Sequence, residues 1–309
     1  MIALEESSWH CHFELKLRRT NGVAFQTFFS DVLETRYQSD FVRLKPQGSL
    51  GDKGCDGYLQ SSGTVFACYG AQNGATAKQS ALITKLNDDF EKAQEDLPSI
   101  MKAWCWAHNL IEGMPADALL AFNKLKADHE EYVFEMFGPP RLRQLFSEMT
   151  EDQRAVYLGP LARREDFFHL QVSEVKELSD ALVAAVASKG GVQVGVDPVS
   201  PKKLEYNDIP SAWSQLLQMG RLNAKYVEQY FAAHHNPLQG EQVAQLFRQK
   251  YAELKAQSLS SEAVIVELYA FIAGWDAISV ERQVAAYSIL SHLFDSCDIF
   301  ENVPEEAAI

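Results

Sequence analysis

Residues 48–59, GSLGDKGCDGYL, and residues 63–69, GTVFACY, decide the fold of the first half of the chain. Glycine, serine and aspartate crowd the first segment, which is typical of a turn, and the apolar residues that follow are typical of paired strands. Asp52 and Asp56 stand four residues apart around this turn. A carboxylate at a strand end can hold a hard divalent cation, which prefers oxygen ligands. The same residues also suit an ordinary hairpin turn, so a metal site and a structural turn both stay open.

Outward from this hairpin, the spacing of apolar residues predicts an α/β domain followed by a helical one. Residues 22–37 have apolar side chains at spacings of three and four, which is typical of an amphipathic helix. Beyond the first half the pattern is helical, apart from a Gly/Pro/Val segment at 189–203 that suits a loop or a small hairpin. We therefore predict an α/β N-terminal domain over residues 1–168 and an all-α C-terminal domain over residues 169–309. The first domain is expected to contain, in chain order, a helix at 22–37, strands at 41–44, 56–59 and 64–69, a helix at 78–97, a strand at 101–108, and mostly helix over 115–165 with a short strand at 132–137.

The composition is that of a folded protein without a disulfide framework. The 309 residues are 47% hydrophobic and 23% charged, and the five cysteines include no C-x-x-C pair. The N-terminus lacks the basic and apolar segments of a secretory signal, and no apolar run is long enough to span a membrane. We expect a reduced, soluble, cytoplasmic protein.

The charge of the chain is negative and unevenly distributed. A formal net charge of −14 argues against a surface that coats nucleic acid or anionic membrane as a whole. The first hundred residues hold 10 basic and 13 acidic side chains, so a net −11 falls on the remainder. If the chain binds a polyanion at all, the first third is therefore the expected place.

Common phosphate-binding and hydrolase motifs, such as G-x-x-x-x-G-K-[ST], G-x-S-x-G and H-E-x-x-H, do not occur in the sequence. His10, Cys11 and His12 are adjacent, but the alternation of a strand would separate Cys11 from both histidines. We therefore predict a surface strand at this position, in preference to a metal site.

The predicted helix at 22–37, the G-D-x-G-x-D-G segment at 51–57 and the apolar strand that follows resemble the PD-(D/E)XK restriction-endonuclease-like core, in its Mrr-like branch. The resemblance implies a restriction-endonuclease-like mixed sheet flanked by helices, and DNA cleavage that depends on Mg²⁺ or Mn²⁺. It also makes Asp56 the metal ligand and Asp52 a turn residue or auxiliary ligand.

The resemblance assigns further residues around Asp56. Gln26 takes the position of the helix carboxylate often seen in the family, and Glu34 follows two turns later. The family's next strand normally carries Glu or Gln, any residue, then Lys, but here those positions are Ala67, Cys68 and Tyr69. Tyrosine, with a pKa near 10, does not supply a cation, and alanine does not bind metal. The groups left for catalysis at this site are Tyr69 itself and Lys53, with Lys45 or Lys78 as other substitutes from neighbouring loops.

A second resemblance covers more of the chain. The runs GDKGCDGYL and GTVFACYGA, the segment LEYN at 204–207 and the segment SHLFDSCDIFE at 291–301 are similar to proteins of the bacterial ABC three-component (Lamassu-like) defence systems. This resemblance implies an SMC-like ABC ATPase and a middle-component protein as partners. The segment at 291–301 suits either a docking surface or a capped, packed helix end.

These observations support two functions. One is a metal-dependent DNA endonuclease that serves as the effector of the defence complex, in which a homo-oligomer would be usual. The other is a catalytically degenerate subunit that keeps the nuclease fold and acts as a DNA-binding or scaffold component. The cluster around Asp52 and Asp56 favours the nuclease, whereas Ala67 and Tyr69 favour the scaffold. An unrelated small-molecule enzyme is a third alternative.

Overall fold

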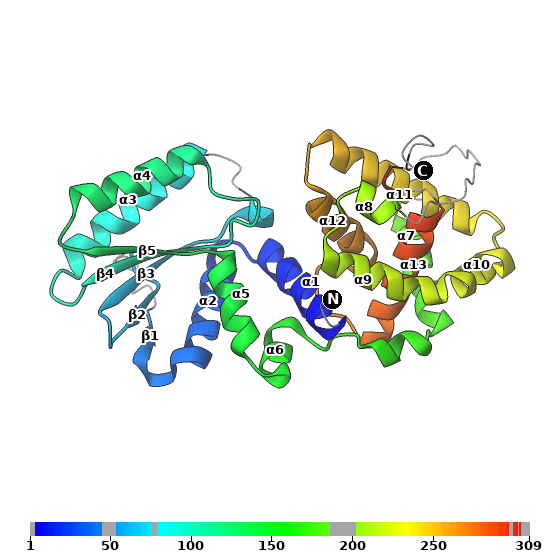
Figure 1. Cartoon of the computed structure of the whole chain (residues 1–309), viewed down its shortest axis with the longest axis horizontal. Coiled ribbons are helices and arrows are strands. Elements are labelled where there is room, and N and C mark those ends of the chain that lie inside the picture. Colours follow the sequence, from blue (N-terminus) through cyan, green and yellow to red (C-terminus); the bar gives the residue numbers. More distant parts are fainter. Residues whose placement is uncertain are drawn as a thin grey trace. The chain divides into compact units, whose positions relative to one another are not determined.

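The computed structural model describes residues 4–44, 54–75, 79–185, 202–296, 299–301 and 303. The chain divides into two compact units (Figure 1). The sheet unit comprises residues 16–157, and the helical unit comprises residues 1–15 together with residues 158–309.

The division differs from the boundary predicted at residues 168/169. The first residues of the chain belong to the helical unit because Cys11 and Leu15, on helix α1 (Leu4–Arg19), are part of its hydrophobic core. Ala162 and Phe167 belong to the same core. The apolar partners of these side chains are distant in the sequence, so the local pattern did not indicate them.

The sheet unit contains one mixed sheet of five strands in the order β1-β2-β3-β4-β5 (Figure 1). Strands β1, β2 and β3 form an antiparallel meander, and β3, β4 and β5 run parallel. Every residue of β4 is buried, which is typical of a parallel strand covered on both faces. The strands are β1 (Phe41–Arg43), β2 (Gly57–Leu59), β3 (Thr64–Tyr69), β4 (Ala103–His108) and β5 (Val133–Phe137).

Helices cover both faces of this sheet (Figure 1). On one face, Phe29 of α2 (Gly22–Tyr37) packs against Phe66 and Phe137, with ring centroids 5.6 and 5.2 Å apart. On the other face, Phe90 of α3 (Gln79–Asp96) packs against Trp104, and α4 (Ala116–Asp128) adds further apolar side chains. Helices α5 (Pro139–Glu148) and α6 (Glu151–Leu158) follow β5.

The helical unit is built around two almost fully buried helices, α12 and α13. Tyr269 of α12 stacks on Tyr287 of α13 with ring centroids 4.7 Å apart, and Trp213 packs against both rings. Ser260 and Ser279 cap the N-termini of these two helices by accepting a backbone N–H. The helices of this unit after α1 are α7 (Val172–Ala185), α8 (Lys203–Tyr206), α9 (Ser211–Gly220), α10 (Ala224–Ala233), α11 (Gln239–Ala256), α12 (Ser261–Ala273) and α13 (Val280–Asp295).

The architecture confirms an α/β unit combined with a helical one, and each predicted strand of the sheet is present within two residues of its expected limits. The predicted surface strand at His10–His12 is wrong, because these residues lie in α1, where Cys11 and His12 are buried. Most of the predicted loop or hairpin at 189–203 lies outside the described residues. Within the described residues, no helix combines the length and apolar character needed to cross a membrane.

Helices α9 and α13 approach closely at Gly220. A Cβ atom at this position would lie 2.3 Å from Ser291 Oγ and 2.5 Å from the backbone oxygen of Tyr287. We expect Gly220→Ala to lower the free energy of unfolding by about 2 kcal/mol, because the backbone of α13 would have to move. Thermal unfolding of Gly220→Ala and of Gln218→Ala, an exposed position on the same helix, measures this effect. Equal midpoints for the two variants would contradict the close contact.

Candidate functional site

Asp56 lies in a buried bend at the start of β2. Its backbone N–H donates to Phe66 O at 2.7 Å, and its backbone oxygen accepts from the N–H of Leu44 at 3.2 Å. Its side chain turns back on β3, where Oδ2 accepts the backbone N–H of Cys68 at 2.6 Å. The residue is only 9% exposed. The carboxylate therefore takes part in joining β2 to β3.

The thiol of Cys68 is a second neighbour of this carboxylate. Burial raises the pKa of Cys68 well above its ordinary value, and the charge of Asp56 and a hydrogen bond to it raise the pKa further. The thiol is thus neutral at pH 7 and donates to the Asp56 carboxylate. The polar groups around Asp56 form a satisfied structural cluster.

Helix α3 packs on the turn that leads to Asp56. Gly54 has a φ of +66°, and a Cβ there would lie 2.3 Å from the backbone oxygen of Asp89. The buried Asp89 carboxylate accepts from Lys85 Nζ at 2.7 Å. The positive charge of Lys85 partly offsets the raised pKa of the Cys68 thiol.

The two residues at the family's acid and lysine positions are packed into the apolar layer under α3. Ala67 is 1% exposed and belongs to that core. The ring of Tyr69 stacks on Trp106 with centroids 5.7 Å apart. Within the described residues, no group of three or more His, Cys, Asp and Glu side chains is arranged to hold a metal ion. Asp52 lies outside the residues that were compared in this way, so a site for Mg²⁺ or Mn²⁺ at Asp52 and Asp56 stays a prediction.

Four of the residues considered for this site, Asp52, Lys53, Lys45 and Lys78, lie outside the described residues. Their predicted roles stay predictions. Gln26 is half-buried on α2, the helix whose apolar side chains cover the other face of the sheet.

Glu34 belongs to a different cluster, at the end of α2. Both of its carboxylate oxygens accept from Arg43 of β1, at 2.9 and 2.8 Å, and Asp31 accepts from the same guanidinium group. Burial lowers the pKa of Arg43, but the hydrogen bonds and charges of Asp31 and Glu34 outweigh this effect and raise it. The structure thus brings Asp56 and Tyr69 into neighbouring strands but assigns Glu34 to an ion-pair cluster.

An open cavity of about 750 Å³ lies beside this ion-pair cluster. Its walls come from the last turn of α1, the polar face of α2 and the end of α6, all within residues 16–157. The sequence analysis missed this cavity, because its walls come from segments more than one hundred residues apart.

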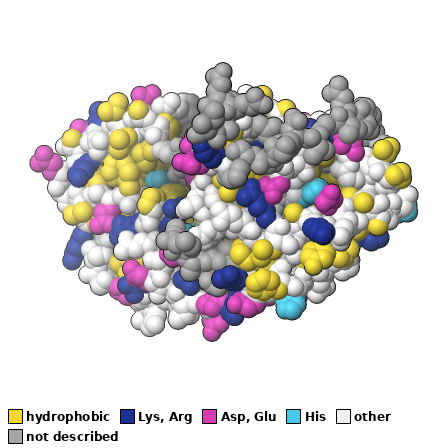
Figure 2. Space-filling view, turned by 45° about the vertical axis from the view of Figure 1, so that its right-hand side comes forward, with side chains coloured by type: hydrophobic (Ala, Val, Ile, Leu, Met, Phe, Trp, Pro, Cys, Tyr) yellow, Lys and Arg dark blue, Asp and Glu magenta, His cyan; other side chains and the backbone are white. Residues whose placement is uncertain are grey.

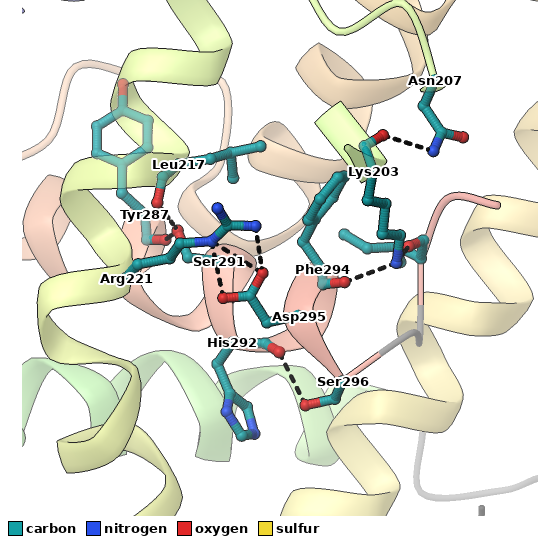
Figure 3. A network of polar contacts seen from close by, with 11 residues as sticks. Lys203, Asn207, Leu217, Arg221, Tyr287, Ser291, His292, Phe294, Asp295 and Ser296 are labelled. Atoms are coloured by element: carbon teal, nitrogen blue, oxygen red, sulfur yellow. Dashed lines mark hydrogen bonds and ion pairs between the residues drawn. The ribbon is translucent and has the colours of Figure 1, made fainter. Parts of the chain in front are cut away.

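The helical unit contains a polar network at the C-terminal end of α13 (Figure 3). Lys203 Nζ donates to the backbone oxygens of Phe294 at 2.6 Å and Ile299 at 2.9 Å. The side chain of Asn207 donates to the backbone oxygen of Glu301 and accepts from its N–H, at 2.8 and 2.9 Å. The network therefore joins residues 203–207 to residues 294–301.

A second part of the network joins α9 and its following turn to α13 (Figure 3). Arg221 makes a bidentate ion pair with Asp295, with Nε–Oδ2 and Nη2–Oδ1 distances of 2.8 and 2.6 Å. Ser291 Oγ donates to Leu217 O at 2.9 Å. Charge-assisted bidentate pairs fix geometry more strongly than single hydrogen bonds do.

The described part of the segment at 291–301 contains a packed helix end, because Phe294, Ile299 and Phe300 are at most 6% exposed. A docking role of the same segment stays a prediction. The sequence analysis missed Lys203 and Arg221, because a single basic residue next to a helix gives no sign of its distant partner.

Residues 173–301 match the family model described as C-terminal domain 10 of the ABC-three component (ABC-3C) systems. The matched range holds the whole network of Figure 3 but less than half of the chain, and the sheet unit lies outside it. The match supports membership in an ABC-three component system and indicates a component of such a defence system. Comparisons with curated proteins and with solved structures found no match.

Proposed function

We propose that this chain is a non-catalytic scaffold subunit of an ABC-three component defence system, with a degenerate nuclease-like sheet unit. The observation that carries this proposal is the position of the Asp56 carboxylate, which is buried and accepts the backbone N–H of Cys68 at 2.6 Å. This carboxylate stabilises the hairpin, and its burial, with 9% of the residue exposed, leaves little room for a metal ion with its water ligands.

The order of elements supports a nuclease-like origin of the sheet unit. Helix α2, the antiparallel strands β1 to β3, helix α3 and the parallel strand β4 follow one another as the resemblance to the PD-(D/E)XK core implies. At the positions that carry chemistry in that family, however, Ala67 and Tyr69 are packing residues.

The charge distribution favours protein partners over DNA. Residues 101–309 carry a net charge of −11, and Figure 2 shows Lys and Arg side chains interspersed with Asp and Glu on the face in view. Continuous basic surfaces are the usual signature of DNA binding. In this proposal the C-terminal domain docks to the SMC-like ABC ATPase or to the middle-component protein of the system.

One observation favours the alternative function, a DNA endonuclease. Lys85 pairs with Asp89 at 2.7 Å on the part of α3 that packs against Gly54 in the turn before Asp56, and its charge acts on the thiol of Cys68. An ammonium group there could replace the lysine that the family carries at the position of Tyr69.

Plasmid cleavage distinguishes the two functions. The purified chain, alone and with its partner proteins, is incubated with supercoiled DNA and Mg²⁺ or Mn²⁺. The scaffold proposal predicts no cleavage, whereas cleavage that is lost in both Asp56→Ala and Lys85→Met would establish the endonuclease instead.

The same Asp56→Ala variant tests the structural role of the carboxylate. We expect its free energy of unfolding to fall by about 2 kcal/mol, because the buried N–H of Cys68 loses its acceptor. Asp128→Ala, at an exposed position of α4 in the same unit, serves as the control. Equal stability of the two variants in thermal unfolding would contradict the structural role.

A further inference from the structure

The cavity beside α2 has the size and lining of a small-molecule site. Its volume of about 750 Å³ falls within the range of about 300–1,000 Å³ that is usual for ligand pockets. Most of its lining side chains are charged or carry a hydroxyl group. A lining of this kind fits a polar ligand.

One side of the cavity is basic. Lys16 and Arg19, three residues apart on the last turn of α1, lie on the same face of the helix and both line the cavity. The exposed Thr27 adds a hydroxyl group to the lining, whereas the hydroxyl of Thr20 donates to the backbone oxygen of Lys16 at 2.9 Å. An arginine fork with a neighbouring lysine and hydroxyl groups is a typical set of donors for a phosphate group.

The other side of the cavity offers acceptors. Asp31 and Glu34 line it, and Arg43 holds both carboxylates in place through its ion pairs. Each carboxylate oxygen can accept more than one hydrogen bond, so these groups can still accept from a ligand. Tyr157 adds a rigid aromatic wall, since its hydroxyl donates to the backbone oxygen of Asp31 at 2.9 Å.

A ligand that satisfies both sides carries a phosphate at one end and hydrogen-bond donors at the other. We propose that this cavity binds a nucleotide, with its phosphate at Lys16 and Arg19 and with amino or ribose hydroxyl groups directed to Asp31 and Glu34. The site does not involve the cluster around Asp56, so the proposal stands independently of the scaffold function.

Calorimetric titration of the full chain with AMP, GMP, adenosine and inorganic phosphate tests the proposal. We expect at least one of the two nucleotides to bind saturably, with an affinity at least tenfold higher than that of adenosine or phosphate. The double variant Lys16→Gln/Arg19→Gln should weaken nucleotide binding at least tenfold. The matched double variant Lys124→Gln/Lys126→Gln changes the net charge equally on exposed α4 and should bind within twofold of the unchanged chain.

A second variant separates loss of the site from loss of folding. Thr27→Trp places a large ring at an exposed position of α2 that lines the cavity, without altering charge, and should abolish nucleotide binding while thermal unfolding stays unchanged. The proposal is overturned if neither nucleotide binds saturably, if phosphate alone binds as well as AMP and GMP, or if binding survives in both cavity variants.

Discussion

At pH 4 the helical unit is expected to be about 3 kcal/mol less stable than at pH 7 because of one residue, His12. Its imidazole is buried on α1, bonded to the hydroxyl of Tyr287 at 3.1 Å and packed edge-on to the ring of Tyr269. Burial lowers the pKa of His12 from 6.5 to about 4. Between these two values the unfolded chain binds a proton that the folded chain excludes, so stability falls as the pH decreases from 6.5. A pKa difference of roughly 2.5 units corresponds to about 3 kcal/mol.

A glutamine at position 12 tests this dependence, because it can still hydrogen-bond to Tyr287 but does not titrate. When the pH is lowered from 7 to 4, we expect the free energy of unfolding of His12→Gln to fall by about 3 kcal/mol less than that of the unchanged chain. Chemical denaturation at the two pH values measures the difference. His169→Gln, which removes an exposed imidazole of the same unit, should behave like the unchanged chain. A pH dependence that is the same in all three proteins would show that His12 does not titrate as the burial implies.

The parts of the fold that the sequence could predict are those with a regular apolar pattern. Strands β3 and β4 were predicted, at 64–69 and 101–108, because apolar residues fill both faces of a covered sheet, a pattern that is visible locally. Helix α2 was predicted for the same reason, since Phe25, Phe29 and Leu33 recur on one face. Helices and strands whose buried faces produce a regular apolar pattern can therefore be predicted from the sequence.

Helix α1 lacked such a signal. Ser7, Ser8, His12 and Glu14 are all buried in it, so polar residues occupy positions where the sequence pattern expects apolar ones. Ser7 donates to Gln215, more than two hundred residues away. Burial that depends on such distant partners is invisible in a local pattern.

The candidate sites show the same limit. The sequence placed Asp56 at the start of a strand, and in the structure Asp56 directly precedes β2. The direction of the carboxylate depends on the N–H and thiol of Cys68, which no spacing rule specifies. Glu34 likewise was assigned by the resemblance to the nuclease core, and its ion pair with Arg43 on β1 could not be predicted from the spacing of residues.

The second large effect is expected at Lys203, the residue that joins the two segments of the C-terminal network. Its Nζ is bonded to the backbone oxygens of Phe294 and Ile299 and lies 4.5 Å from the centroid of the Phe294 ring, and the residue is 0% exposed. Phe294 is in the last turn of α13, where backbone oxygens have no partner within the helix and a cation is favoured by the helix dipole. Lys203 thus acts as a side-chain cap of α13.

Methionine at position 203 retains most of the apolar stem but removes the charged donors. We expect Lys203→Met to lower the free energy of unfolding by about 3 kcal/mol, because two buried backbone oxygens lose a charged donor at once. Lys225→Met, at an exposed position of the same unit, removes the same charge without removing a cap and should change stability by less than about 0.5 kcal/mol. Chemical denaturation of both variants, together with limited proteolysis of the C-terminal segment, measures the effect. If Lys203→Met is as stable as Lys225→Met, the packing of Phe294 and Ile299, rather than the ammonium group, holds the end of α13 in place.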